Sequence, residues 1–325
     1  MDVFLGIDVG SVTTKIALLD SNGSLLLHVY EKTEGQPVLA IQKSLWQIKQ
    51  ALPGGARVCG TGTTGSARHL AGAMVGADLV KNEISCHAVA ALKFLPEVKT
   101  IIEIGGQDSK IIIIRDGVVT DFGMNTVCAA GTGSFIDSQA RRLNLSIEEF
   151  AEKSLAGANP VAITGRCTVF AESDMIHKQQ MGYPPEDIIY GLCQSLACNY
   201  LNNVGKGKEI LTPVLFQGGV AFNQGIVRSL GDALGYEVIV PAHHEMMGAI
   251  GTAILVRDEM RAKPRLAAFR GFGISQKSYG VSSFVCETCE KACEIAQISE
   301  HDSVLARWGG RCEIWEKPKE SITAN

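Results

Sequence analysis

The sequence lacks the long apolar segments and the leader of a membrane or secreted protein. No stretch of its 325 residues reaches the roughly 18 uncharged apolar residues that a membrane-spanning helix requires. The chain opens Met-Asp-Val-Phe-Leu-Gly-Ile-Asp, which indicates a strand containing a carboxylate rather than the basic start and apolar run of a secretory leader. We therefore expect a cytoplasmic protein with no membrane partner.

The sequence also lacks an excess of charge of either sign. Lys and Arg number 30 against 34 Asp and Glu, so the net charge is −4, and no basic block stands out. A nucleic acid is therefore not an expected partner. The hydrophobic fraction of 46% is ordinary for a globular protein, and the length suggests two domains with a small third.

Cysteine, in contrast, is plentiful, with ten in the chain. Four of them crowd near the C-terminal end. Because thiols stay reduced in the cytoplasm, we expect buried thiols or metal ligands rather than disulfides. The six cysteines scattered through the rest of the chain are Cys59, Cys86, Cys128, Cys167, Cys193 and Cys198.

One pattern of strands and turns occurs twice. The first copy has strands predicted over 3–9, 15–20 and 24–30, with Asn22-Gly23 as a hairpin signal. Helices at 36–51 and 66–76 follow, with a short strand at 56–59 between them. The second copy has strands over 99–104, 110–115 and 118–123, with Asp116-Gly117 as its hairpin signal. This weak internal repeat predicts an α/β protein with two similar lobes.

The second lobe is predicted to continue to a basic linker at 261–265. Its expected elements are helices at 133–142, 146–155, 184–204, 222–234 and 245–260, and strands at 212–217 and 237–240. We therefore divide the chain into a first lobe over 1–98, a second lobe over 99–262 and a Cys-rich C-terminal extension over 263–325.

Three turns have the composition of nucleotide-binding loops. Small residues let backbone N–H groups approach phosphate oxygens, hydroxyls add donors, and a carboxylate at a strand end can hold Mg²⁺ through water. We expect Asp8 to hold Mg²⁺ through water. We expect Glu103 or Asp108 to face the metal, and Gln107 to orient a water. The candidate nucleotide-binding residues are Gly10, Ser11, Val12, Thr13, Thr14 and Lys15 in the first turn, Gly105, Gly106 and Gln107 in the second, and Gly218, Gly219, Val220 and Asn223 in the third.

Any one of these turns could be an ordinary hairpin, but three in this order within a duplicated frame favour a nucleotide site. In this arrangement the chain resembles the superfamily of acetate and sugar kinases, heat-shock chaperones and actin. The resemblance implies an actin-like ATPase fold whose two ribonuclease-H-like lobes close around ATP or ADP. It also implies phosphate loops over 6–20 and 101–114, an adenosine loop over 214–226, and connecting helices that start near 128 and 245.

The glycine pattern Gly60-x-Gly62-x-x-Gly65 allows a rival hypothesis of NAD binding, because it follows a predicted strand and precedes a helix. A dinucleotide fingerprint normally belongs to the first unit of its domain, whereas this one comes after three strands and a helix. The acidic residue expected about 20 positions further on is also not placed at a strand end. We therefore do not expect NAD binding.

Two single cysteines precede predicted helices. Cys128 lies in Asn-Thr-Val-Cys-Ala-Ala-Gly-Thr-Gly-Ser-Phe, and Cys167 lies in Gly-Arg-Cys-Thr-Val-Phe-Ala-Glu-Ser-Asp. Each could be a small buried thiol. The free N–H groups and positive dipole of a helix start, however, favour thiolates and suit an anionic cluster. A [4Fe–4S] cluster needs four thiolates, so two chains related by a two-fold axis could share one.

These two segments resemble the activators of 2-hydroxyacyl-CoA dehydratases, and the resemblance covers about residues 1–258. The ATPase subunits of benzoyl-CoA reductases and the reductases of double-cubane iron–sulfur proteins are similar. The resemblance implies a homodimer with one [4Fe–4S] cluster bridged by Cys128 and Cys167. It implies that ATP hydrolysis drives a low-potential electron, received from ferredoxin or flavodoxin, into a partner iron–sulfur enzyme. Two alternatives stay open: a small-molecule kinase of the same fold, and an ATP-gated scaffold with inert cysteines.

The C-terminal extension departs from the short activators. It contains Cys286-x₂-Cys289-x₃-Cys293-x₁₈-Cys312, a set that is difficult to assign to core packing. The first three cysteines have a spacing closer to iron–sulfur ligands than to the paired C-x₂-C knuckles of a zinc ribbon. A second [4Fe–4S] cluster is the preferred hypothesis, structural Zn²⁺ comes next, and a partly disordered thiol-rich tail is the alternative.

Overall fold

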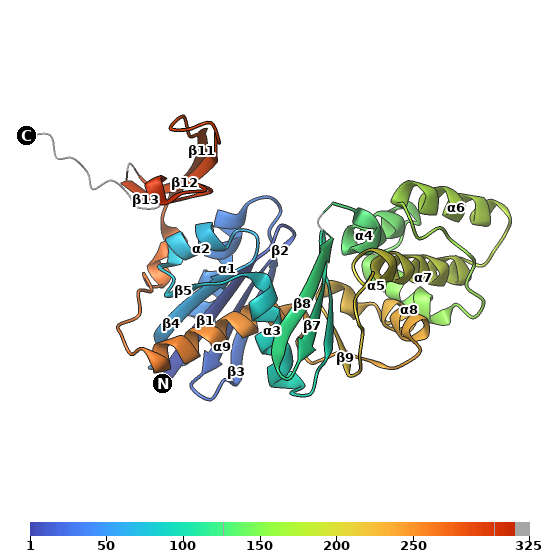
Figure 1. Ribbon diagram of the computed structural model, residues 1–325, viewed down its shortest axis with the longest axis horizontal. Helices are drawn as coiled ribbons and strands as arrows, with labels where there is room; N and C mark the ends of the chain where they lie inside the picture. The colour runs from blue at the N-terminus through green and yellow to red at the C-terminus, as the bar shows by residue number, and fades with distance from the viewer. Residues whose placement is uncertain (126, 302, 316–325) are drawn as a thin grey trace, which may run out of the picture. The chain divides into compact units, whose positions relative to one another are not determined.

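The computed structural model describes residues 1–125, 127–301 and 303–315. The chain divides into two compact units (Figure 1). Unit 1 comprises Met1–Cys86 and Gly248–Asn325, and unit 2 comprises His87–Met247. Each unit is built on its own five-stranded sheet.

The sheet of unit 1 has the strand order β3-β2-β1-β4-β5. The pairs β1–β2 and β2–β3 are antiparallel, and the pairs β1–β4 and β4–β5 are parallel. The strands are β1 (Asp2–Val9), β2 (Thr13–Asp20), β3 (Leu25–Lys32), β4 (Arg57–Thr64) and β5 (Leu79–Val80), and the helices are α1 (Pro37–Ala51), α2 (Arg68–Val75), α3 (Glu83–Phe94), which crosses into unit 2, and α9 (Met247–Ala262).

Helix α9 packs closely on strands that have glycine at the contact. A Cβ atom added to Gly6 would lie 2.0 Å from the carbonyl oxygen of Ala249. A Cβ on Gly62 would lie 2.7 Å from Cγ2 of Thr252, and one on Gly60 would meet Met260. Glycine within a strand often marks such a close approach. Because Gly60 and Gly62 lie inside β4 rather than in a turn, the strand predicted over 56–59 was too short.

Unit 2 repeats the sheet of unit 1, with the order β10-β9-β6-β7-β8. The pairs β6–β7 and β7–β8 are antiparallel and the pairs β6–β9 and β9–β10 are parallel, so this order read from β8 to β10 matches that of unit 1 read from β3 to β5. The predicted duplication of two similar α/β lobes is therefore confirmed. The strands are β6 (Thr100–Ile104), β7 (Ser109–Arg115), β8 (Val118–Asn125), β9 (Val214–Gln217) and β10 (Val238–Ile239).

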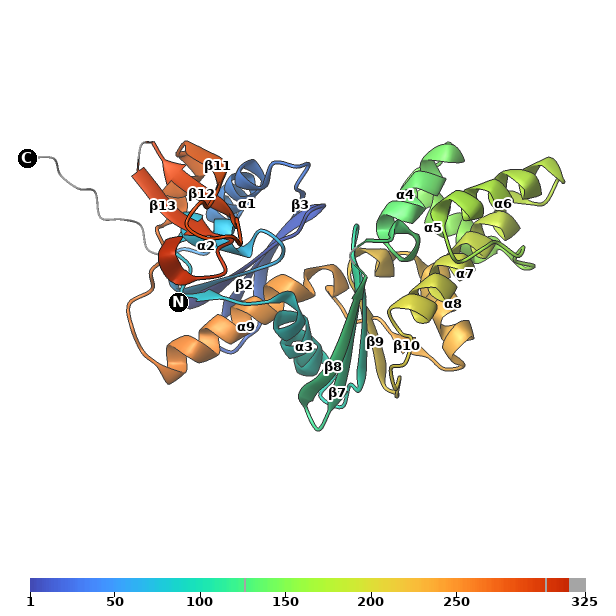
Figure 2. The ribbon, with the colours of Figure 1, turned by 45° about the horizontal axis from the view of Figure 1, so that its top comes forward.

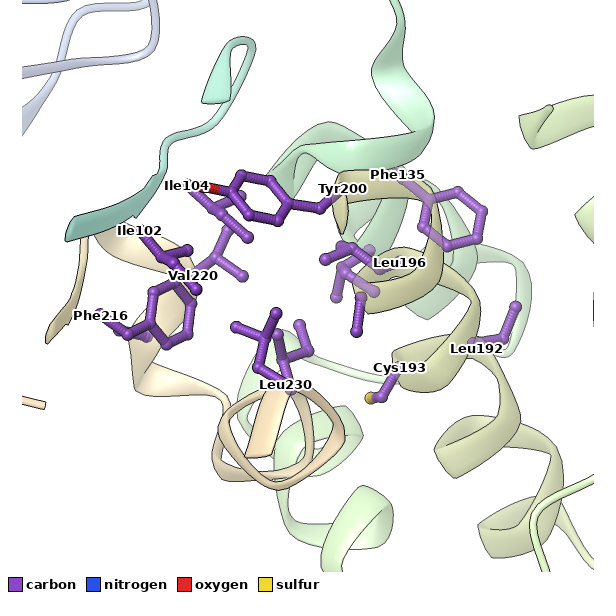
Figure 3. Packing of buried hydrophobic residues seen from close by; sticks show 14 of the residues in the cluster. Ile102, Ile104, Phe135, Leu192, Cys193, Leu196, Tyr200, Phe216, Val220 and Leu230 are labelled. Atoms are coloured by element: carbon purple, nitrogen blue, oxygen red, sulfur yellow. The ribbon is translucent and has the colours of Figure 1, made fainter. Parts of the chain in front are cut away.

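The helices of unit 2 enclose one apolar core. Figure 3 shows Leu196 of α7 on the side of its helix that faces Phe216 of β9 and Leu230 of α8 in this core. The helices are α4 (Gly133–Arg142), α5 (Ile147–Ala156), α6 (Thr168–Gln180), α7 (Pro185–Asn203) and α8 (Gln224–Leu234). Helix α5 begins with a capping box in which Ser146 and Glu149 exchange hydrogen bonds.

Several predicted boundaries were wrong. Helices α3 and α6 lie outside the ranges predicted to be helical. The helix expected from 222 begins at Gln224, after a 3₁₀ turn, η2 (Gly219–Phe222), and the helix expected near 128 is a 3₁₀ turn, η1 (Ala129–Gly131), followed by α4. The strand expected from 212 begins at Val214.

The C-terminal extension forms a three-stranded antiparallel sheet on unit 1. Its strands are β11 (Tyr279–Val285), β12 (Glu294–Glu300) and β13 (Ser303–Trp308), in the order β11-β12-β13. Ile298 of β12 and Ile274, in the 3₁₀ turn η4 (Phe272–Gln276), are fully buried in the core shared with α1 and α2, and Trp308 packs against it. Figure 2 shows this sheet beside α2. The extension over 266–315 is therefore folded onto unit 1.

Among the described residues, no helix has both the length and the apolar character needed to cross a membrane.

Candidate functional site

In unit 1 the first phosphate loop joins β1 to β2. Asp8 at the end of β1 is 5% exposed, and Lys15 is its partner in the strand register. The Nζ atom of Lys15 lies 3.3 Å from Oδ2 of Asp8. The carboxylate is therefore held beside the loop by an ion pair that is itself largely buried.

Two glycines outside the predicted nucleotide-binding residues leave room for this carboxylate. A Cβ added to Gly248 of α9 would lie 2.5 Å from Oδ2 of Asp8, and one added to Gly65 would lie 2.7 Å from Oδ1. Gly65 also has φ of +90°, a conformation that glycine adopts without strain. The third glycine of the Gly60-x-Gly62-x-x-Gly65 pattern thus has a role beside Asp8 rather than beside a dinucleotide.

The shape of the first loop is set by hydrogen bonds within the protein. The N–H of Gly10 donates to the carbonyl of Thr13 at 2.9 Å. The buried hydroxyl of Thr14 pairs with that of Thr33 at 3.0 Å, and the Thr33 hydroxyl donates to the carbonyl of Gly10. Thr14 therefore braces the loop, while Ser11 is exposed and accessible to a ligand.

In unit 2 the second phosphate loop joins β6 to β7 around a buried lysine. Lys110 is 1% exposed, and its Nζ donates to Oε2 of Glu103 at 3.0 Å and to Oδ2 of Asp108 at 2.9 Å. Glu103 and Lys110 are partners in the strand register, as Asp8 and Lys15 are in unit 1, and both pairs are separated by 7 positions in the chain. The duplicated fold has thus kept a carboxylate–lysine pair at the same place in each lobe.

The third loop lies next to this carboxylate. Gly218 has φ of +95°, and a Cβ there would lie 2.4 Å from the carbonyl of Ile104 and 2.9 Å from Oε1 of Glu103. Asn223 caps α8 by accepting the N–H of Ile226, while its own Nδ2 is buried without a hydrogen-bond partner among the described residues. The structure therefore brings Gly218 and Glu103 together, whereas Gln107 stands exposed at the tip of its loop.

The second phosphate loop is hydrogen-bonded to the start of α4. The N–H of Gly133 donates to the carbonyl of Gly105 at 2.9 Å, and the N–H of Ser134 donates to that of Gly106 at 2.8 Å. The hydroxyl of Ser134 adds a second bond to the same oxygen at 2.6 Å. A short segment from Cys128 through η1 leads directly into this helix, so the loop and the cysteine are connected through a few residues.

Cys128 is half-buried at the start of η1, and the side chain of Asn125 holds its backbone from both sides. Asn125 accepts the N–H of Cys128 at 2.9 Å and donates to its carbonyl at 2.7 Å. Asn125 is itself 8% exposed at the end of β8. The position of this thiol is therefore fixed by the backbone rather than left to a free loop.

Cys167 is the residue immediately before α6, and its segment is also fixed. Asp174 of α6 accepts both the hydroxyl and the N–H of Thr164, at 2.6 and 2.8 Å, and these bonds lower the pKa of Asp174. Asn199 of α7 donates to the carbonyl of Gly165 at 2.6 Å. A Cβ on Gly131 of η1 would lie 2.9 Å from Oδ1 of the same asparagine, so Asn199 lies between the two cysteine-bearing segments.

The two thiols differ from the cysteines of the core. Burial raises the pKa of Cys193 to about 12 and also raises the pKa of Cys86, which keeps both thiols protonated. Cys128 and Cys167 are instead partly exposed. Their neighbours include exposed apolar side chains: Val127 is 96% exposed, Val169 65% and Phe170 63%.

The four cysteines of the extension lie in the loops of its sheet. Cys286 is buried, Cys293 is half-buried, and Cys289 and Cys312 are exposed. The indole Nε1 of Trp315 donates to Sγ of Cys286 at 3.2 Å.

Comparison with known proteins gives consistent matches. Residues 5–256 match the model of the BadF/BadG/BcrA/BcrD ATPase family. The (R)-2-hydroxyglutaryl-CoA dehydratase activating ATPase of Acidaminococcus fermentans is 34% identical over 277 residues, which cover 77% of this chain and 95% of that protein. The activator of lactoyl-CoA dehydratase of Anaerotignum propionicum is 35% identical over 268 residues, covering 80% of this chain and 99% of that protein.

Solved structures agree. The activator of 2-hydroxyisocaproyl-CoA dehydratase from Clostridium difficile, with bound ADPNP, has a TM-score of 0.72 at 32% identity and covers 80% of this chain and 96% of its own. The crystal structure of component A of the Acidaminococcus fermentans (R)-2-hydroxyglutaryl-CoA dehydratase has a TM-score of 0.73 at 32% identity. The match covers 80% of this chain and 100% of that chain. The family match ends before the C-terminal extension.

Proposed function

Because the chain belongs to the BadF/BadG/BcrA/BcrD ATPase family, we propose that it is an ATP-dependent activator that passes low-potential electrons to a partner iron–sulfur enzyme. The named relatives activate acyl-CoA dehydratases, so a 2-hydroxyacyl-CoA dehydratase is the first partner to test. A benzoyl-CoA-type reductase and a double-cubane protein are the others. Ferredoxin or flavodoxin would supply the electrons.

The observation that carries this proposal is the pair of partly exposed, backbone-fixed thiols before η1 and α6. Cys128 and Cys167 from each of two copies would supply the four thiolates of one [4Fe–4S] cluster. Such a cluster transfers single electrons at a potential tuned by its surroundings. The exposed Val127, Val169 and Phe170 beside the cysteines fit burial against a second copy of the chain.

We assign ATP binding to the three loops. The exposed Ser11 of the first loop and the backbone of 106–107 in the second would bind phosphate oxygens, and the backbone of the half-buried Gly219 would accept the adenosine. Asp8, with Lys15 on one oxygen, would hold Mg²⁺ through water. Gln107 is exposed and free to orient the attacking water, and Glu103 or Asp108 would face the metal.

The chain of contacts from Gly106 through Ser134 to Cys128 explains how the nucleotide would act on the cluster. A change at the phosphates would alter the position of Gly106, and the two hydrogen bonds from Ser134 would transmit it to the start of α4. Because Cys128 precedes that helix by five positions, through η1, its sulfur would move with the helix start. ATP turnover would therefore change the surroundings of the cluster.

The test is to replace Cys128 and Cys167 singly by alanine and to purify each protein without oxygen. We expect each variant to lose the cluster while keeping ATP binding, because neither thiol belongs to the nucleotide loops. The control is Cys59→Ala, a half-buried cysteine of β4 in unit 1. Retention of the cluster by both variants, or loss of ATP binding together with the cluster, would overturn the proposal.

A further inference from the structure

The topology of the C-terminal extension brings all four of its cysteines to one end of the sheet. Cys286 directly follows β11 and Cys293 directly precedes β12, and Val285 and Glu294 are register partners. The N–H of Cys286 donates to the carbonyl of Cys293 at 2.8 Å, which closes the hairpin. Cys289 lies in the loop between them.

The fourth cysteine returns to the same end from β13. Strands β12 and β13 are antiparallel, and Trp308 at the end of β13 pairs with Ala296 near the start of β12. Gly309 then passes so close that a Cβ there would lie 2.5 Å from the carbonyl of Glu294. The chain reaches Cys312 three residues later. Cys286 and Cys312, which are 26 positions apart in the sequence, therefore lie at the same end of the sheet.

The sheet that carries these cysteines is anchored by buried side chains of β12. Ile295 and Ile298 of β12 are fully buried, and the latter belongs to the core of unit 1. The Phe284 and Trp315 rings meet edge to face at 4.9 Å between centroids beside Cys286. The N–H of Trp315 points at Sγ of Cys286, and hydrogen bonds to sulfur are a means by which proteins tune iron–sulfur centres.

We propose that Cys286, Cys289, Cys293 and Cys312 hold a [4Fe–4S] cluster that belongs to the extension alone. A single zinc ion with Zn–S bonds of about 2.3 Å in a tetrahedron requires sulfurs about 3.8 Å apart. In the described part of the chain, no three of these sulfurs lie within 4.8 Å of one another. A cubane spreads its thiolates over four iron atoms and therefore needs the wider arrangement.

This second site does not depend on the proposed bridging cluster. The family match covers residues 5–256, so the activators to which the chain is similar give no information about the extension. All four ligands come from one chain and from one small sheet. The site can therefore be occupied in a protein that has lost Cys128 and Cys167.

The experiment uses the full-length chain carrying both Cys128→Ala and Cys167→Ala, purified without oxygen and reconstituted with ferrous iron and sulfide. Iron, sulfide and zinc are measured per chain, and the iron is examined by Mössbauer spectroscopy. We expect about four iron and four sulfide per chain with the spectrum of a cubane. Adding Cys289→Ala should remove them, as should Cys312→Ala, because both cysteines are exposed and their loss does not disturb the core.

The matched control is Cys59→Ala in the same background, since Cys59 lies on β4 of the same unit and has no place in the extension. It should leave the iron content unchanged. About one zinc per chain without iron would overturn the cluster in favour of a zinc site. Neither metal, or iron that survives both Cys289→Ala and Cys312→Ala, would overturn the site itself.

Discussion

Ser134 donates both its backbone N–H and its hydroxyl to the carbonyl oxygen of Gly106, at 2.8 and 2.6 Å. The oxygen belongs to the second phosphate loop, and the serine belongs to the helix that follows Cys128. This one contact joins the part of unit 2 that would sense the nucleotide to the part that would hold the cluster.

Replacing Ser134 by alanine removes one of the two bonds to Gly106 and keeps the backbone bond. We expect the free energy of unfolding to fall by about 0.5–1.5 kcal/mol, the typical value of one hydrogen bond. We also expect the cluster to be retained, but the effect of ATP on the rate at which a chelator removes its iron to be reduced. The control is Ser173→Ala, whose hydroxyl bonds to Val169 within α6. An unchanged nucleotide effect in the Ser134 variant would contradict the coupling.

The side chain of Asn125 holds the backbone of Cys128. Asn125→Ala should therefore speed the loss of iron from the proposed cluster without affecting the nucleotide loops. We expect a loss of about 1–3 kcal/mol in stability, because the N–H of Cys128 and its carbonyl lose their partner. Two quantities are measured: the rate at which a chelator removes iron, and the affinity for ATP. Asn202→Ala is the matched change, since that asparagine is exposed on α7 and bonds only to Cys198 among the contacts of the described structure. Equal rates of iron loss in the two variants would show that Asn125 has no such role.

Lys110 is buried between two carboxylates, and Lys110→Met removes the cation that contacts both Glu103 and Asp108. Removing one partner of a buried ion pair costs about 3–5 kcal/mol, and urea denaturation measures this directly. Lys208→Met, which breaks a more exposed pair with Asp121, should have little effect. A small loss at Lys110 would mean that the carboxylates find other partners.

Gly248→Ala should impair ATP hydrolysis by displacing Asp8, since the new Cβ would lie 2.5 Å from Oδ2. We expect a decrease of about 100-fold in turnover, the effect of a displacement on the order of 1 Å in a catalytic group. Alanine favours a helix more than glycine does, so helix α9 itself is not weakened. Gly54→Ala, where a Cβ meets nothing within 4 Å, is the control. Full ATPase activity in the Gly248 variant would remove Asp8 from the mechanism.

The repeated lobes could be predicted from the sequence because their signals are local. Asp116 and Gly117 both have positive φ, as the predicted hairpin requires, and Ser146 with Glu149 forms a capping box. The alternation of apolar and turn residues then located the strands. Such signals depend on neighbours in the chain, so one sequence is enough to read them.

The contacts that shape the site could not be predicted in this way. Gly65 and Gly248 meet Asp8 from distant parts of the chain, and Gly60 and Gly62 are explained only by the packing of α9. The glycine pattern alone therefore allows a dinucleotide interpretation. The course of β4 through Gly60 and Gly62 decides against it. Likewise, the spacing of the C-terminal cysteines suggested a metal, but only the register of β11, β12 and β13 places them at one end.

Whether two chains share one cluster is tested by native mass spectrometry of the protein carrying Cys289→Ala and Cys312→Ala, purified without oxygen. This variant leaves Cys128 and Cys167 as the proposed cluster ligands. We predict a dimer whose mass includes one [4Fe–4S] cluster, and a monomer without iron after chelation. A cluster found on the monomer, or a dimer without iron, would contradict it.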